Sequence, residues 1–208
     1  MSLDLQKQTE KGIGILRKGG VVAYPTDTVY GLGASMDSAE AVDRVFEVKS
    51  RPRHMSLPLL VADKSQMASL AANITPLAHR LIDAFLPGAV TLVFPASSRV
   101  PDYLRTPEGT IALRIPNHPV PIALITGIGT AIIGTSANLS GRPNPLTAPE
   151  VKDQLGDRIE LIIDGGRCSG TESTIIDVTK AVPVILRKGA VSVSDIEKVC
   201  GISLGSGG

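Results

Sequence analysis

Short apolar runs alternate with amphipathic segments from one end of the chain to the other. The apolar runs have the length and aliphatic content of buried strands, and they lie at residues 21–24, 58–62, 90–94, 110–115 and 130–135 and near residues 161, 174 and 184. The amphipathic segments carry apolar residues at helical spacing, and they lie at residues 3–18, 38–49, 76–86, 149–155 and 194–199. Since no linker interrupts the alternation, the pattern predicts one α/β domain in which helices cover a largely aliphatic sheet.

Local signals define several boundaries of these elements. Ser38 can cap the second helix, and Thr75 followed by a proline is a typical start for the third. Thr147 and Glu150 have the spacing of a capping box before the fourth. We expect the domain to span residues 1–200, with a disordered Gly/Ser tail at 201–208.

Composition excludes several classes of protein. The 208 residues carry 21 basic and 20 acidic side chains, and only six are aromatic, which disfavours a dedicated nucleic-acid binder. The two cysteines are too few for a disulfide framework, so a reducing compartment is expected. Neither a signal peptide nor a membrane span is visible in the sequence. These features predict a soluble cytoplasmic protein without membrane partners.

The first polar cluster follows the first predicted strand, at residues 25–33, and reads PTDTVYGLG. Ligands collect at the carboxyl ends of strands in α/β sheets, and two hydroxyls, a carboxylate and a phenol form a compact recognition set there. An ordinary turn whose hydroxyls bond to their own backbone explains the pattern equally well.

Two further clusters have similar alternatives. Residues 49–54, KSRPRH, follow a predicted helix, where cations either stabilise the helix C-terminus or bind phosphates. Residues 135–141, TSANLSG, with Asn144 beyond them, offer neutral hydrogen bonds to a nucleotide or another polar ligand. No Walker loop or dinucleotide fingerprint is present. Arg114 lies within an apolar strand and needs an anionic partner, for which Asp164 would suffice.

Together these clusters resemble the YrdC family of threonylcarbamoyl-AMP synthases over residues 19–191, in what looks like its short, single-domain form. The shared motifs occur in the family's order: PTDTVYGL at 25–32, KxRP at 49–52, PG at 87–88 before TL at 91–92, ALRIP at 112–116, SANxSG at 136–141, DGG at 164–166, ST at 173–174 and LRxG at 186–189.

The resemblance implies a YrdC-like fold, with a twisted sheet of mixed parallel and antiparallel strands flanked by helices around a concave basic cleft. It also implies a nucleotidyltransferase that makes threonylcarbamoyl-AMP and pyrophosphate from L-threonine, bicarbonate and ATP. The product would feed the machinery that transfers the threonylcarbamoyl group to tRNA. Mg²⁺ would arrive on the ATP phosphates and not in a metal site of the protein.

The resemblance also assigns roles to individual residues. Lys49 and Arg51 are the expected catalytic residues and hold the triphosphate and bicarbonate. The other expected ATP contacts are Thr110, Ser136, Asn138, Asn144 and Arg187. The expected L-threonine contacts are Thr28, Tyr30, Arg114 and Ser173, with Arg114 as the bidentate partner of the substrate carboxylate.

The sequence departs from the family pattern in two places. The stretch from Arg51 to Pro58 is about two residues longer than usual, and Ala62 stands where some members have a histidine at the threonine site.

Two alternative functions remain. An RNA-binding module could use the same basic cleft for tRNA or double-stranded RNA, and the enzyme itself could bind tRNA weakly. A carbamoyltransferase of hydrolase maturation contains a YrdC-like domain, but we expect its zinc finger to be absent here.

Overall fold

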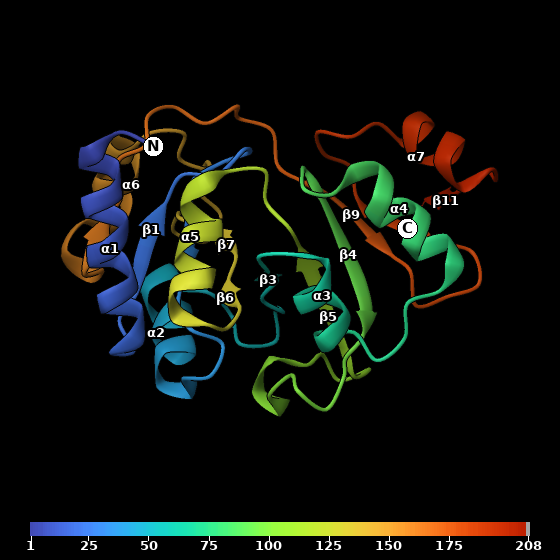
Figure 1. Cartoon of the computed structure of the whole chain (residues 1–208), viewed down its shortest axis with the longest axis horizontal. Helices are drawn as coiled ribbons and strands as arrows, with labels where there is room; N and C mark the ends of the chain where they lie inside the picture. The colour runs from blue at the N-terminus through green and yellow to red at the C-terminus, as the bar shows by residue number, and fades with distance from the viewer. Residues whose placement is uncertain (207–208) are drawn as a thin grey trace.

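The computed structural model describes residues 1–206 and contains helices and strands in alternation (Figure 1). The helices are α1 Leu3–Arg17, α2 Ala39–Lys49, α3 Lys64–Leu70, α4 Pro76–Phe85, α5 Pro119–Ile128, α6 Ala148–Leu155 and α7 Val193–Cys200, with 3₁₀ turns η1 Asp102–Leu104 and η2 Gly156–Arg158. The strands are β1 Val22–Tyr24, β2 Gly31–Gly33, β3 Leu59–Leu60, β4 Val90–Pro95, β5 Thr110–Arg114, β6 Ile132–Ile133, β7 Thr135–Ser136, β8 Leu161–Ile162, β9 Thr174–Asp177, β10 Val184–Arg187 and β11 Gly205–Ser206.

The strands are divided between two sheets. The smaller sheet has the order β7-β2-β1-β8, and the larger sheet has the order β11-β10-β9-β4-β5-β3-β6. Each sheet contains both parallel and antiparallel pairs, such as β1 with β8 and β1 with β2. The predicted α/β class with mixed strand pairing is therefore confirmed, with two sheets in place of one.

The sequence pattern did not predict several of these elements correctly. Helix α5 is apolar around most of its circumference, so it shows no amphipathic period, and its prolines lie in the first turn, where they are tolerated. The apolar run at residues 130–135 splits into β6 and β7 around Gly134, where a Cβ would lie 2.5 Å from the Leu60 side chain. Strand β2 lies inside the first polar cluster, and α3 has only seven residues.

The smaller sheet is covered by the packed pair α1 and α5, on the left in Figure 1. Leu16 of α1, Leu124 of α5 and Val22 of β1 belong to one hydrophobic cluster. A second, larger cluster contains residues of both sheets and of α2, α4 and α7. The two sheets therefore share a continuous apolar interior.

The larger sheet has two different faces. Leu92, Phe94 and Ile176 are fully buried and pack in the cluster that includes α4 and α7. The intervening residues of the same strands, such as Val93 and Ile175, face a cavity instead. This alternation follows from the two-residue period of a strand, and it gives the cavity a floor made of sheet.

The C-terminal segment is described through Ser206. Helix α7 ends at Cys200, and Gly201 adopts the left-handed conformation that commonly follows a helix. Of the tail expected to be disordered at 201–208, residues 205–206 form β11 and pair with β10, while residues 207–208 lie outside the described residues. None of the described helices is long and apolar enough to cross a bilayer.

Candidate functional site

A cavity of about 350 Å³ lies between the two sheets. Its floor is formed by β4, β5, β9 and β10 of the larger sheet, and its opposite wall by β2 and β7 of the smaller one. The loops at residues 26–29 and 51–58 close two of its sides. The cavity therefore collects the polar clusters at residues 25–33, 49–54 and 135–141 that the sequence singled out.

One row of residues across the floor carries an arginine at each end. Thr91 pairs with Ile175, Ile175 pairs with Arg187, and the antiparallel pairing of β4 with β5 continues to place Thr91 opposite Arg114. All four residues line the cavity. Three interstrand spacings separate the two arginine Cα atoms by roughly 14 Å. Two guanidinium groups thus face one cavity from the same row.

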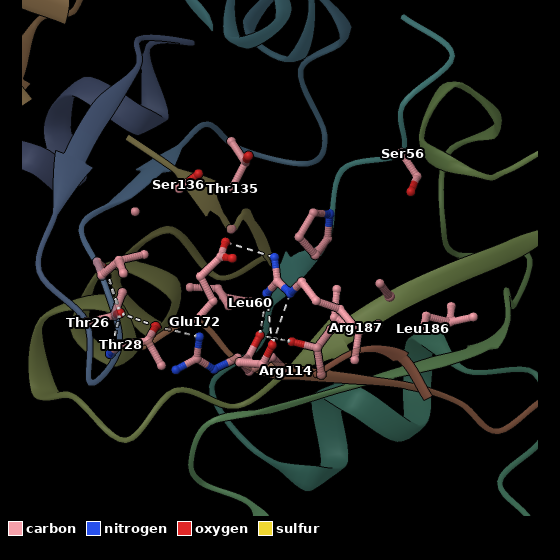
Figure 2. Close-up of a pocket in the computed structure, with 18 of the residues that line it drawn as sticks. Thr26, Thr28, Ser56, Leu60, Arg114, Thr135, Ser136, Glu172, Leu186 and Arg187 are labelled. Carbon is pink, nitrogen blue, oxygen red and sulfur yellow. Dashed lines mark hydrogen bonds and ion pairs between the residues drawn. The ribbon is translucent and has the colours of Figure 1, made fainter. Parts of the chain in front are cut away.

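Arg114 is held by three segments of the chain. Its Nη1 donates to Thr28 Oγ1 at 3.0 Å (Figure 2). Its Nε donates to Gly88 O at 2.9 Å and its Nη2 to Asp27 Oδ1 at 2.6 Å. The anionic partner is therefore Asp27 and not Asp164. Both side chains of the pair are largely buried, with 8% and 16% of their surfaces exposed. Three of the five N–H donors of the guanidinium are used, so two remain for a ligand.

The loop after β1 is both a capped turn and part of the cavity wall. Thr26 Oγ1 donates to Val29 O at 2.7 Å and accepts from the Thr28 N–H at 3.0 Å, as in an ordinary hydroxyl-stabilised turn. The Thr28 hydroxyl, however, lies at the cavity and contacts Arg114. The interpretation of the cluster as a hydroxyl-stabilised turn is therefore confirmed, whereas a role in ligand recognition stays a prediction for Thr26 and Thr28, which both line the cavity.

Tyr30 does not line the cavity. Its hydroxyl donates to Gly166 O at 2.9 Å and lies 3.5 Å from Asp164 Oδ1, so it anchors the Asp-Gly-Gly loop. Burial raises the pKa of Tyr30. Its side chain is fully buried against that loop. The predicted role of Tyr30 as a wall of the substrate pocket stays a prediction.

Lys49 and Arg51 lie on either side of Ser50, which ends α2 in the left-handed conformation with φ 49°. The Lys49 ammonium is buried and donates to Ser136 O, to Asn138 O at 2.9 Å and to Asn138 Oδ1 at 3.0 Å. Burial, together with repulsion from Arg51, lowers the pKa of Lys49 to about 7. Lys49 thus holds the loop at 136–138 and does not itself line the cavity.

Arg51 faces the cavity. Its Nη2 donates to Ser56 O at 3.0 Å, in the stretch that is longer than the family pattern. Its Nε is buried and makes no hydrogen bond among the described residues. Burial lowers the pKa of this guanidinium, which is the effect of removing a cation from water without full compensation. The Arg51 guanidinium thus carries a positive charge at the cavity wall, which is suited to an anionic ligand.

Arg187 closes the other end of the floor. Its Nη1 donates to Glu172 Oε1 at 2.8 Å, and its Nε and Nη2 donate to Ser173 O at 3.2 and 2.9 Å. The Ser173 hydroxyl lies 3.2 Å from Arg187 Nη2 and 2.8 Å from the Thr91 hydroxyl. Burial lowers the pKa of Arg187, and the Glu172 carboxylate acts in the opposite direction.

The structure brings together about half of the sequence-predicted site residues. Those that line the cavity are Thr28, Arg51, Arg114, Ser136, Ser173 and Arg187. Those that do not are Tyr30, Lys49, Thr110, Asn138 and Asn144. Thr110 bonds to the hydroxyl of Thr106 at 2.8 Å, and Asn138 Nδ2 donates to Arg142 O at 2.6 Å. Asn144 is partly exposed in the loop before α6.

Sequence reasoning missed Glu172 and Thr91 as residues of the cavity, and it missed Asp27 as the partner of Arg114. Within residues 1–206, Glu172 is the one carboxylate-bearing residue that lines the cavity. The described residues contain no group of three or more His, Cys, Asp and Glu side chains placed to hold a metal ion. Both cysteines are free and buried, burial raises the pKa of each thiol, and neither lines the cavity.

The fold and the cavity define an α/β protein with a cavity between two mixed sheets that is lined by three arginines. The model of the Sua5/YciO/YrdC family, described as "Telomere recombination", matches residues 14–189. A threonylcarbamoyl-AMP synthase of Pyrococcus abyssi is 43% identical over 189 residues, which cover 90% of this chain and 56% of the relative. A threonylcarbamoyl-AMP synthase of Bacillus subtilis is 41% identical over 199 residues, which cover 93% of this chain and 57% of the relative.

The structural comparison agrees. The crystal structure of P. abyssi Sua5 complexed with L-threonine superposes with a TM-score of 0.94 at 39% identity, covering 100% of this chain and 61% of that one. The chain therefore belongs to the Sua5/YciO/YrdC family, as its motifs suggested. It spans about half the length of these two curated relatives.

Proposed function

We propose that this chain is a nucleotidyltransferase, an L-threonylcarbamoyladenylate synthase that forms threonylcarbamoyl-AMP and pyrophosphate from L-threonine, bicarbonate and ATP. The observation that carries the proposal is the row across the cavity floor, with Arg114 at one end and Arg187 at the other. Such a cavity suits a ligand pair with a carboxylate at one end and phosphates at the other. The names of the relatives and the L-threonine in the P. abyssi structure support the same reaction.

L-threonine would bind at the Arg114 end. Two N–H donors of Arg114 are left for a carboxylate, and the Thr28 hydroxyl contacts the same guanidinium. The Ser173 hydroxyl lies beside Thr91, the next residue of the row. The amine nitrogen would attack the carbon of bicarbonate with loss of water, which leaves a carbamate. That step needs the reactants held together more than it needs a covalent partner from the protein.

ATP would bind at the other end. Arg51 and Arg187 line the cavity and are placed to neutralise phosphate charge, and Ser136 of β7 lies on the opposite wall. A carbamate oxygen would then attack the α-phosphorus and expel pyrophosphate, and fixed cations stabilise the charge that develops on the phosphoryl oxygens. Lys49 would act indirectly, by holding residues 136–138 in place.

Mg²⁺ would enter with the ATP phosphates. Glu172 is the carboxylate-bearing residue that lines the cavity, and it already binds Arg187. The main ligands of the ion would therefore be the phosphate oxygens of ATP and water. When bound, the ion would supply charge neutralisation on the triphosphate. We further propose that the protein acts in the cytoplasm and passes its labile product to a tRNA-modifying enzyme.

The activity is tested by pyrophosphate release from ATP in the presence of bicarbonate, with L-threonine compared with L-serine. The proposal predicts release that depends on threonine and bicarbonate, with L-serine much less effective. The RNA-binding alternative predicts tight, steeply salt-dependent retention of tRNA on filters without any threonine-dependent release, and that result would exclude the enzyme.

A further inference from the structure

Glu172 has no assigned role, although its carboxylate lies in the cavity wall. Its backbone is fixed directly before β9. Glu172 O accepts the Ala190 N–H at 2.8 Å, and a Cβ on Gly189 would clash with the Glu172 carbonyl and with Ser173. The glycine of the Leu-Arg-x-Gly motif therefore lets the two segments approach closely, and this approach sets the position of the Glu172 side chain.

The ion pair with Arg187 uses only part of the Glu172 carboxylate. Oε1 accepts from Arg187 Nη1 at 2.8 Å (Figure 2), and Oε2 makes no hydrogen bond within residues 1–206. Arg187 is also bound to Ser173 through Nε and Nη2. Because these two bonds do not involve Glu172, the guanidinium keeps an anchor without it. The carboxylate thus has an oxygen left over in a wall where a substrate would lie.

The charges around the cavity define what this oxygen can bind. Arg51, Arg114 and Arg187 all line it, whereas Asp27, which neutralises Arg114, does not. An α-amino acid carries a carboxylate and an ammonium group, and the ammonium needs an acceptor, with a carboxylate the strongest one available. Glu172 directly precedes Ser173, whose hydroxyl contacts Thr91 in the row that begins at Arg114.

We propose that Glu172 binds the α-ammonium group of L-threonine and so selects an α-amino acid over an α-hydroxy acid. The inference rests on the proposed function of the site. It makes Glu172 a specificity-determining residue for the amine, on the side of the substrate that faces Arg187, whereas Arg114 takes the carboxylate. A purely structural Glu172, acting through Arg187, would change the use of ATP instead.

The test is a calorimetric binding measurement without ATP, using two ligands. One is L-threonine, and the other is the same molecule with a hydroxyl group in place of the amine. The variant is Glu172→Gln. The matched control is Glu160→Gln, because Glu160 is also 36% exposed and paired with an arginine, Arg44 at 2.5 Å, but does not line the cavity.

Wild type and the control should prefer L-threonine over the hydroxy analogue by at least about tenfold, which corresponds to about 1.4 kcal/mol. Glu172→Gln should lose this preference, while its affinity for the hydroxy analogue changes by less than about twofold. Equal weakening of both ligands would overturn the inference, as would unchanged threonine binding with a raised KM for ATP. Pyrophosphate release by the wild type is measured in parallel, so that a failure of the proposed function is seen separately.

Discussion

Arg114 and Asp27 form a buried ion pair, with Nη2 and Oδ1 2.6 Å apart, between two residues that are 87 positions apart in the sequence. The same Asp27 oxygen accepts the backbone N–H of Asn117 at 3.2 Å. The pair therefore ties the loop after β1 to the end of β5. It also occupies one of the N–H donors of the Arg114 guanidinium.

Removing the Asp27 carboxylate should destabilise the fold. Asp27→Ala leaves a buried guanidinium without its partner, so the free energy of unfolding should fall by about 3 kcal/mol. Asp27→Asn keeps an oxygen acceptor and should cost roughly half as much. Urea unfolding followed by circular dichroism measures both values.

The control for this pair is Asp43→Ala. Asp43 pairs with Arg53 at the surface, where both side chains are more than half exposed, so its loss should cost less than about 1 kcal/mol. Equal decreases in the free energy of unfolding for Asp27→Ala and Asp43→Ala would show that the buried pair stabilises the fold no more than the exposed pair.

Arg114→Lys should affect threonine far more than ATP. Lysine keeps the charge but loses the planar fork, so the KM for L-threonine should rise at least about tenfold while the KM for ATP changes less than about twofold. Arg105→Lys is the control, because Arg105 also binds backbone carbonyls, those of Ser97 and Val100, and does not line the cavity. Parallel changes in both KM values would contradict the placement of threonine at Arg114.

The low pKa of Lys49 predicts a pH-dependent stability. Burial lowers this pKa to about 7 in the folded protein, whereas an unfolded lysine keeps a value near 10.5. The unfolded state therefore binds more protons between these values, so the contribution of Lys49 to the free energy of unfolding increases as the pH rises. Between pH 7 and pH 9 the increase should be about 2 kcal/mol.

Lys49→Met isolates this contribution, because the variant has the same other titrating groups. The difference between wild type and variant in unfolding free energy should grow by that amount from pH 7 to pH 9. A difference that stays constant over this range would mean that Lys49 keeps an ordinary pKa in the folded protein.

Gly31 should tolerate no side chain. A Cβ there would lie 2.7 Å from the ring of Tyr24, which is fully buried and donates to Ile133 O at 2.8 Å. Gly31→Ala should therefore lower the free energy of unfolding by about 1–3 kcal/mol. Gly14→Ala serves as the comparison: Gly14 lies in α1, where a Cβ would meet nothing within 4 Å beyond the helix's own backbone, so this change should stabilise by about 0.5–1 kcal/mol. Similar effects at both positions would rule out the clash.

The helix boundaries were predictable where a local signal sets them. Ser38, Thr75 and Thr147 all accept a backbone N–H from the first turn of the helices that they precede. Helix α5 was not predictable in this way, because an element that is apolar on most sides carries no period. The division into two sheets depends on long-range pairing, such as β1 with β8, which no local pattern encodes.

The residues of the cavity can also be divided into those that the local sequence predicts and those that depend on the folded chain. The motifs identified Arg51, Arg114 and Arg187, because Arg51 belongs to a basic cluster after a helix and Arg114 lies within an apolar strand, and because Arg187 is part of the Leu-Arg-x-Gly motif. The partner of Arg114 was not predictable, because Asp27 and Asp164 are equally good candidates until the chain is folded. The different positions of Lys49 and Arg51 were not predictable either, because only the folded chain brings Asn138 to the Lys49 ammonium and leaves Arg51 in the cavity wall.

The proposed reaction can be followed through the carbon of bicarbonate. The purified chain is incubated with L-threonine, MgATP and ¹³C-bicarbonate, and the products are analysed immediately by mass spectrometry. We predict threonylcarbamoyl-AMP that carries the heavy carbon and forms only when all three substrates are present. Consumption of ATP without the labelled adenylate, or no reaction at all, would contradict the proposed synthase activity.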